Sequence, residues 1–145
     1  MASSTVLALG TAPSYSAAII GHDALTLLTD IGIEGDRHAG KKRAVSIVCT
    51  GELAQAANDF GIEQFDGLRT RRNIVVDLDE LPRAHGTRFT VGEVELAVWR
   101  DCAPCNLMDE IFGEGAQAAL RQRAGITASV VRGGIVRLGD SLTLA

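Results

Sequence analysis

Hydrophobic residues along this chain fall mostly in short runs bounded by Gly, Asp or Asn, a pattern typical of short strands. One run alternates, so that Leu96 and Val98 share one face of a strand while Glu93 and Glu95 lie on the other. We therefore predict a β-rich chain. The predicted strands cover residues 5–9, 25–28, 44–49, 73–78, 88–91, 94–99, 127–131 and 141–144.

Helical periodicity is confined to three segments. Apolar residues recur at helical spacing over 53–60, directly after Thr50, which we expect to cap this helix. A second helix is predicted to begin near Asn106 and to end at Gly113, and a third to cover residues 116–124.

The connections after the middle strands are too short for repeated βαβ units, so the sheet is expected to be mainly antiparallel. We predict a mainly β fold with appended helices, in which the sheet closes into a small, mostly antiparallel β-barrel. The 145 residues are 46% hydrophobic and show no internal repeat or linker, which fits one domain over residues 1–145.

The charge balance argues against a nucleic-acid partner, because 18 acidic and 14 basic side chains give a net charge of -4. No apolar run approaches the roughly 20 residues that a membrane-spanning helix needs, and the first residues lack the features of a secretory signal. We expect a cytoplasmic protein that binds neither nucleic acid nor a membrane.

Three cysteines are too few for a disulfide framework, which fits a reducing compartment and leaves at least one thiol free. In the motif Cys102-Ala-Pro-Cys105, Cys105 stands between a predicted strand and a predicted helix, where unpaired N–H groups would stabilise a thiolate. We expect Cys105 to be the most reactive thiol and Cys49, inside an apolar strand, to lie in the core. Alternatively, the cysteines of the motif are small buried hydrophobic residues.

Two other uses of the C-x-x-C motif stay open. A zinc site would need a second pair of ligands, whereas His22, His38 and His85 are scattered along the chain. A thioredoxin-like dithiol of Cys102 and Cys105 would need a parallel βαβ framework around the motif, which the strand pattern does not predict. The dithiol is the stronger of these two alternatives.

A basic segment precedes the predicted strand at 44–49. In it Asp36, Arg37 and His38 stand between turn-type glycines, and Arg43 follows them. Glycines let backbone N–H groups approach an anion, and Arg makes bidentate contacts with phosphate. The segment is therefore a candidate anion site, although charge alone favours a solvated basic loop.

A second basic run, 69–73, leads into the next predicted strand and includes Arg72 and Asn73. By itself it is explained as a hairpin end kept soluble by its charge. Two such clusters in an acidic chain predict a local positive pocket. We expect Arg37, Arg43 and Arg72 to line the same pocket as Cys105.

Six motifs occur together along the chain. They are Gly35-Asp36-Arg37-His38, Arg72-Asn73-Ile-Val-Val, Gly86-Thr-Arg88-Phe-Thr-Val-Gly92-Glu, Pro104-Cys105, Gly125-Ile-Thr-Ala and Gly133-Gly134-Ile-Val-Arg-Leu-Gly139-Asp140. In their order and spacing, from about Ile31 to Leu144, they resemble the MOSC domain, which is named after the C-terminal domain of molybdenum-cofactor sulfurases. The resemblance implies a single MOSC-like domain with a β-barrel fold.

The resemblance also implies roles for the candidate residues. Cys105 matches a cysteine that either carries sulfur or binds the molybdenum of a pterin cofactor, so it is the expected catalytic residue and metal ligand. This cofactor, molybdopterin, ends in a phosphate that basic residues can bind by charge-assisted hydrogen bonds. The expected cofactor-binding residues are Asp36, Arg37, His38, Arg43, Arg72 and Asn73.

The chain departs from the family pattern in three ways. Many members have Glu-Asn where this chain has Arg72-Asn73, and Cys102 is an additional thiol. We also expect a lone domain, without the pyridoxal-phosphate portion of the sulfurases or the partner domain of members that reduce N-hydroxylated compounds. We therefore expect a partner, either a sulfur-donor protein or an electron-donor protein.

Three functional hypotheses follow. The first is a molybdenum-cofactor-binding or sulfur-carrying protein that uses Cys105, with reductase activity on N-hydroxylated compounds as one form. The second is a thiol redox module of Cys102 and Cys105. The third is a non-catalytic module that binds a pterin or another anion.

Overall fold

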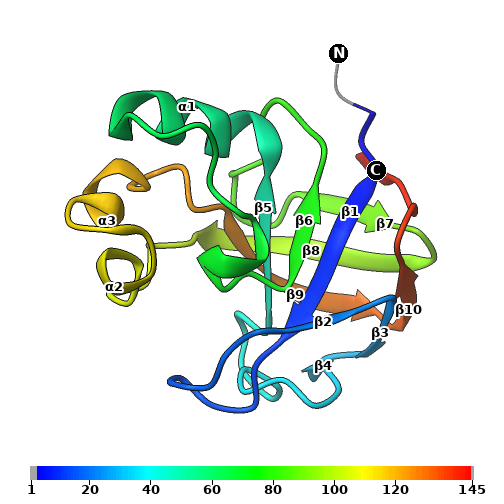
Figure 1. Ribbon diagram of the computed structural model, residues 1–145. Coiled ribbons are helices and arrows are strands. Elements are labelled where there is room, and N and C mark those ends of the chain that lie inside the picture. Colours follow the sequence, from blue (N-terminus) through cyan, green and yellow to red (C-terminus); the bar gives the residue numbers. More distant parts are fainter. Residues whose placement is uncertain (1–2, 145) are drawn as a thin grey trace.

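The structure, a computed structural model, describes residues 3–144 and is shown in Figure 1. The strands are β1 (Val6–Thr11), β2 (Ile20–His22), β3 (Ala24–Leu28), β4 (Gly32–Ile33), β5 (Val45–Cys49), β6 (Ile74–Val76), β7 (Arg88–Val91), β8 (Val94–Asp101), β9 (Ile126–Arg132), β10 (Gly134–Arg137) and β11 (Leu142–Leu144). The helices are α1 (Thr50–Phe60), the short 3-10 helix η1 (Leu68–Thr70), α2 (Met108–Phe112) and α3 (Ala116–Ala119).

Eight strands form one sheet, in the order β11-β7-β8-β9-β5-β6-β1-β2. Its neighbouring strands are antiparallel except β5 and β6, which run parallel and are joined by the connection that contains α1. The other three strands form an antiparallel sheet in the order β10-β3-β4. The chain is thus mostly β, with mostly antiparallel pairing and a few helices, as the sequence predicts.

The prediction of a closed barrel is wrong, because both sheets are open. In the part of the chain that the structure describes, the outer strands β11 and β2 of the large sheet do not pair with each other. Where the chain before β1 passes β11, only an isolated bridge between Thr5 and Ser141 forms. A turn at Gly139, with φ of 88°, lies three residues before the start of the three-residue β11, so little extended chain is left there for a continuous ladder.

The central strands β5 and β6 are buried on both faces, which explains their continuous apolar sequences. Val45, Ile47 and Cys49 pack into the main core between the sheets, whereas Val48 packs on the opposite face with residues of α1 and α3. Figure 1 shows α1, α2 and α3 together on one side of the sheet. The prediction that Cys49 is a core residue is confirmed, since its side chain is completely buried.

Two helix predictions need correction. Thr50 is the first residue of α1, not its cap, and its hydroxyl donates a hydrogen bond to Asp77 Oδ1 at 3.0 Å. The third helix ends at Ala119, well before the predicted end, and Gln122 has a positive φ of 64° that no helix residue adopts. Over residues 3–144, we find no helix long and apolar enough to cross a membrane.

Candidate functional site

A cavity of about 290 Å³ opens on the face of the sheet that carries the helices. Ser46 of β5 and Thr127 of β9 are cross-strand partners, and both contribute to its wall. The rest of the wall comes from loops that follow β1, β4, η1 and β8. The charged and thiol-bearing residues of this wall are Arg37, His38, Arg43, Arg71, Arg72, Cys102 and Cys105.

Cys105 lies in the loop between β8 and α2 and is half-buried. Its Sγ accepts a hydrogen bond from the backbone N–H of Leu107 at 3.4 Å and lies 3.4 Å from the hydroxyl oxygen of Tyr15. The helix α2 begins only at Met108, after a turn in which the Met108 N–H donates to the Cys105 carbonyl at 3.1 Å. The sulfur is thus held by a turn N–H and a phenol, not by the first turn of a helix.

Tyr15 is the second group at the sulfur. Its hydroxyl also donates to Oδ1 of Asn106, the residue that follows Cys105. The hydrogen bond with Cys105 is the main cause that raises the pKa of Tyr15 above its usual value. The phenol therefore keeps its proton at neutral pH and can serve as a hydrogen-bond donor.

The buried guanidinium of Arg72 connects the cysteine loop to the chain that enters β9. Its Nε donates to the Ala124 carbonyl at 2.7 Å, and its Nη2 donates to the Ala103 carbonyl at 2.8 Å. Both acceptors are backbone atoms of loops near the cavity, so Arg72 positions the wall as well as adding positive charge to it.

Arg71 has a separate task, although it is adjacent to Arg72 in the chain. Its left-handed backbone, with φ of 68°, separates the two side chains. The Arg71 guanidinium donates to the carbonyls of Ala17 and Tyr15, both at 2.6 Å, and of Ser14 at 3.4 Å. Its Nε is buried without a hydrogen-bond partner among the described residues. Burial lowers the pKa of Arg71, and the nearby positive charge of Arg37 lowers it further.

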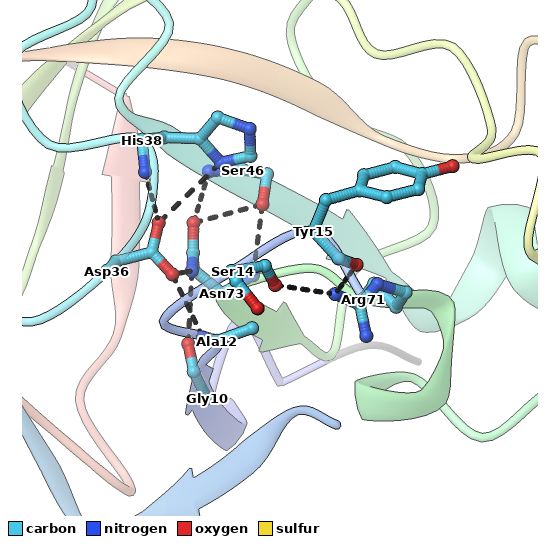
Figure 2. A network of polar contacts seen from close by, with 9 residues as sticks. All are labelled: Gly10, Ala12, Ser14, Tyr15, Asp36, His38, Ser46, Arg71 and Asn73. Carbon is cyan, nitrogen blue, oxygen red and sulfur yellow. Dashed lines mark hydrogen bonds and ion pairs between the residues drawn. The ribbon is translucent and has the colours of Figure 1, made fainter. Parts of the chain in front are cut away.

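A buried polar network supports the cavity from behind, as Figure 2 shows. The Asn73 Oδ1 accepts hydrogen bonds from the N–H and the hydroxyl of Ser46, both at 3.0 Å. Its Nδ2 donates to the Gly10 carbonyl at 3.0 Å and to Asp36 Oδ1 at 3.2 Å. Asn73 is 1% exposed, so protein groups satisfy its side chain. Asn73 therefore joins four segments of the chain.

Asp36 is the charged member of this network and is 6% exposed. Burial alone would raise its pKa, but hydrogen bonds from the His38 side chain and from the backbone N–H groups of Ala12 and His38 outweigh burial and lower it. Asp36 is thus a buried carboxylate at neutral pH, and it accepts from the Ala12 N–H at 3.1 Å and the His38 N–H at 3.2 Å.

The structure brings five of the expected site residues to the cavity wall, namely Cys105, Arg37, His38, Arg43 and Arg72. The two others, Asp36 and Asn73, are buried behind the wall. The expected set did not include Tyr15, Ser46, Arg71 and Thr127, which also line the cavity. Only Arg71 had a signal, its place in the basic run 69–73; Tyr15 lies in a loop without any periodic pattern.

Cys102 also lines the cavity, but its surroundings differ from those of Cys105. Burial raises the pKa of the Cys102 thiol, and Asp101 adds to this effect while Arg72 opposes it. Within residues 3–144, no cluster of three or more His, Cys, Asp or Glu side chains is placed to hold a metal ion. A multidentate zinc site therefore has no support in this geometry.

Comparisons with known proteins bear on the family. The model of the MOSC domain matches residues 34–143. The crystal structure of the YuaD protein from Bacillus subtilis has a similar fold, with a TM-score of 0.83 and 20% identity over 95% of this chain and 93% of that chain. The crystal structure of YiiM from Escherichia coli is also similar, with a TM-score of 0.69 and 24% identity over 97% of this chain and 69% of that chain.

YiiM from Geobacillus stearothermophilus gives a TM-score of 0.69 at 14% identity, over 98% of this chain and 74% of that chain. At these identities the likenesses show the fold alone. A comparison with curated proteins found no match. The family model covers most of the chain, including the loop that carries Cys105 and both basic clusters, and the chain therefore belongs to the MOSC domain family.

Proposed function

We propose that this MOSC-domain protein binds a phosphate-bearing pterin cofactor of molybdenum, or carries sulfur, with Cys105 as the reacting group. The observation that carries the proposal is the shared cavity, in which the half-buried thiol of Cys105 lies among four arginines. A soft thiolate suits molybdenum or sulfane sulfur, and guanidinium groups suit phosphate. In a chain with a net charge of -4, this local concentration of arginine is a specific feature.

The residues present fit such a cofactor. Arg43 is exposed at the cavity wall and free to bind an anion, and Arg71 has a buried Nε without a partner among residues 3–144. Arg37 and His38 would contribute further positive charge and hydrogen-bond donors. When bound, the molybdenum would supply two-electron redox chemistry, of which reduction of an N-hydroxylated compound with electrons from a donor protein is one use.

Sulfur transfer would use Cys105 directly. Its thiolate attacks the terminal sulfur of a persulfide on a donor protein, a new S–S bond forms, and the donor leaves as a thiolate. The Leu107 N–H and the Tyr15 hydroxyl beside the sulfur stabilise the negative charge of the attacking thiolate. The arginines would then hold the phosphate of the acceptor near the loaded sulfur.

A dithiol cycle of Cys102 and Cys105 is the second candidate, because both thiols line one cavity. Burial disfavours the thiolate of Cys102, which weakens this candidate. The third hypothesis, a binding module without thiol chemistry, predicts that anion binding is independent of Cys105.

Elemental analysis of protein from a molybdenum-replete host tests the proposal, together with sulfane sulfur released by cyanide. We expect molybdenum with phosphorus, or sulfane sulfur, in the wild type and its loss in Cys105→Ser, because a serine hydroxyl is a poor soft ligand and forms no persulfide. Cys102→Ser keeps most of either load. If the wild type carries neither load and both variants lose a disulfide-reductase activity equally, the dithiol is the function.

A further inference from the structure

The segment between β1 and β2, residues 12–19, brings Tyr15 to the thiol of Cys105. We propose that Tyr15 is the specificity-determining residue of this site: its hydroxyl positions the sulfur and its ring limits the size of the molecule that reaches it. The inference rests on the proposed function, since it assigns substrate selection to the same sulfur. It implies a small or narrow reacting group, with any bulkier part of the substrate kept outside the ring.

The hydroxyl of Tyr15 can serve both protonation states of the sulfur. With a neutral thiol, the S–H can donate to the phenol oxygen while the phenol donates to Asn106 Oδ1. A thiolate only accepts, and the Tyr15 hydroxyl at 3.4 Å is then the side-chain group placed to donate to it. The sulfur therefore keeps one position through a reaction that changes its charge.

Arg71 fixes the segment that carries the ring. It binds three carbonyls within four residues, those of Ser14, Tyr15 and Ala17, and it is itself 5% exposed. Figure 2 shows the Tyr15 ring above Arg71, extended away from the network of Asp36 and Asn73. A buried cation that binds three carbonyls restrains the backbone of the loop, and the contacts of the Tyr15 hydroxyl with Asn106 and Cys105 restrain the far end of the ring.

The Tyr15 ring lies at the mouth of the Cys105 cavity, between the cavity and solvent. Tyr15 is 51% exposed while also lining the cavity of Cys105, so one side of the ring faces solvent. On the other side of the same segment, Ser16, Ala18 and Ile19 line a second cavity of about 420 Å³, and Arg71 lines both cavities. Truncation of the ring therefore removes part of the wall of the Cys105 cavity and opens a wider approach to the sulfur.

Alkylation of Cys105 by a small and a bulky reagent tests this role in the protein without cofactor. Iodoacetamide, whose iodide leaves as the C–S bond forms, is compared with a fluorescein maleimide, which adds to the sulfur. All variants carry Cys102→Ser in addition. Because Cys49 is buried, the measured alkylation is then that of Cys105. Rates are taken at a pH high enough that they no longer rise with pH.

We expect Tyr15→Ala to raise the ratio of maleimide to iodoacetamide rates by about tenfold, the effect of about 1.4 kcal/mol on a barrier. Tyr15→Phe keeps the ring and should leave that ratio within about twofold, while both rates rise about threefold because the thiolate loses a hydrogen bond. Ile20 is exposed, lies near Tyr15 in the chain and is outside the cavity. Ile20→Ala is therefore the control, and it should change neither the ratio of the two rates nor the rates themselves.

An unchanged ratio in Tyr15→Ala would overturn the steric role, and unchanged rates in Tyr15→Phe would overturn the positioning role. Thermal unfolding of each variant detects a loss of stability. A general loosening of this region would raise the alkylation rates of Cys105 in Ile20→Ala as well as in the Tyr15 variants. The reagents need neither molybdenum nor sulfur. A protein that carries neither load but shows the tenfold ratio change would therefore refute the proposed function and keep the selection by Tyr15.

Discussion

Replacing Asn73 with alanine removes the centre of the buried network. The side chain makes four hydrogen bonds, to the N–H and hydroxyl of Ser46, to the Gly10 carbonyl and to Asp36, with lengths from 3.0 to 3.2 Å. Asn73→Ala leaves these partners buried without it, and alanine is too small for them to close the gap. The change tests whether this residue holds the fold together.

The expected cost follows from the partners that lose a hydrogen bond. A buried donor or acceptor left unsatisfied costs about 1 to 3 kcal/mol, and more when the partner is charged, as Asp36 is. Some partners regain bonds through small shifts or water, so we expect Asn73→Ala to lower the free energy of unfolding by about 3 to 5 kcal/mol. Ser46→Ala removes only a hydroxyl from the same network and should cost about 1 to 2 kcal/mol.

Urea denaturation followed by circular dichroism measures this loss. With a slope of about 2 kcal/mol per molar urea, the midpoint of Asn73→Ala should fall by about 2 M. Asn58→Ala makes the same chemical change at an exposed position of α1 and should alter stability by no more than about 0.5 kcal/mol. A midpoint for Asn73→Ala within about 0.5 M of the wild type would refute the structural role, and the milder Ser46→Ala covers the case of a variant that does not fold.

Three further predictions concern charge and reactivity. The lowered pKa of Asp36 stabilises the fold at pH above the ordinary carboxyl pKa of about 3.9, and this stabilisation is lost as the pH falls through the pKa of the folded state. Asp36→Asn should therefore flatten the acid limb of a curve of stability against pH, and an acid limb parallel to that of the wild type contradicts this prediction. Limiting iodoacetamide at neutral pH should label Cys105 before Cys49, whose pKa burial raises to about 12, and peptide mapping that finds the reverse would remove the site assignment. Arg43→Gln should weaken inorganic pyrophosphate binding by about 1 to 3 kcal/mol in calorimetry, with Arg121→Gln, exposed and outside the cavity, unchanged; equal losses would mean diffuse charge.

The elements that could be predicted from sequence are those with a strong local pattern. The alternation in β8 and the helical spacing in α1 each repeat over several residues. By contrast, β2 is three residues long and exposed on every residue, and β4 has only two residues, so neither carries a periodic signal. Closure of the sheet was wrongly predicted because it depends on whether the two outer strands meet, which strand count alone does not decide.

The candidate site shows the same limit. Cys105 and the basic clusters could be found because thiols and arginines are unusual in these settings, and their convergence was a reasoned expectation. Tyr15 could not be found, since its contact with Cys105 joins positions 90 residues apart. The different tasks of Arg71 and Arg72 depend on one positive φ, which the sequence Arg-Thr-Arg-Arg does not indicate.

The cavity wall is gathered from segments that begin near residue 15 and extend to residue 127, so almost the whole chain must fold before it exists. Any molecule that binds there recognises only the native state, and its binding free energy adds to that of folding. A ligand at 100 times its dissociation constant should add about 2.7 kcal/mol to the free energy of unfolding. The melting temperature of this domain is therefore a general detector for its ligands, which allows pterins, phosphates and N-hydroxylated compounds to be screened before any reaction is known.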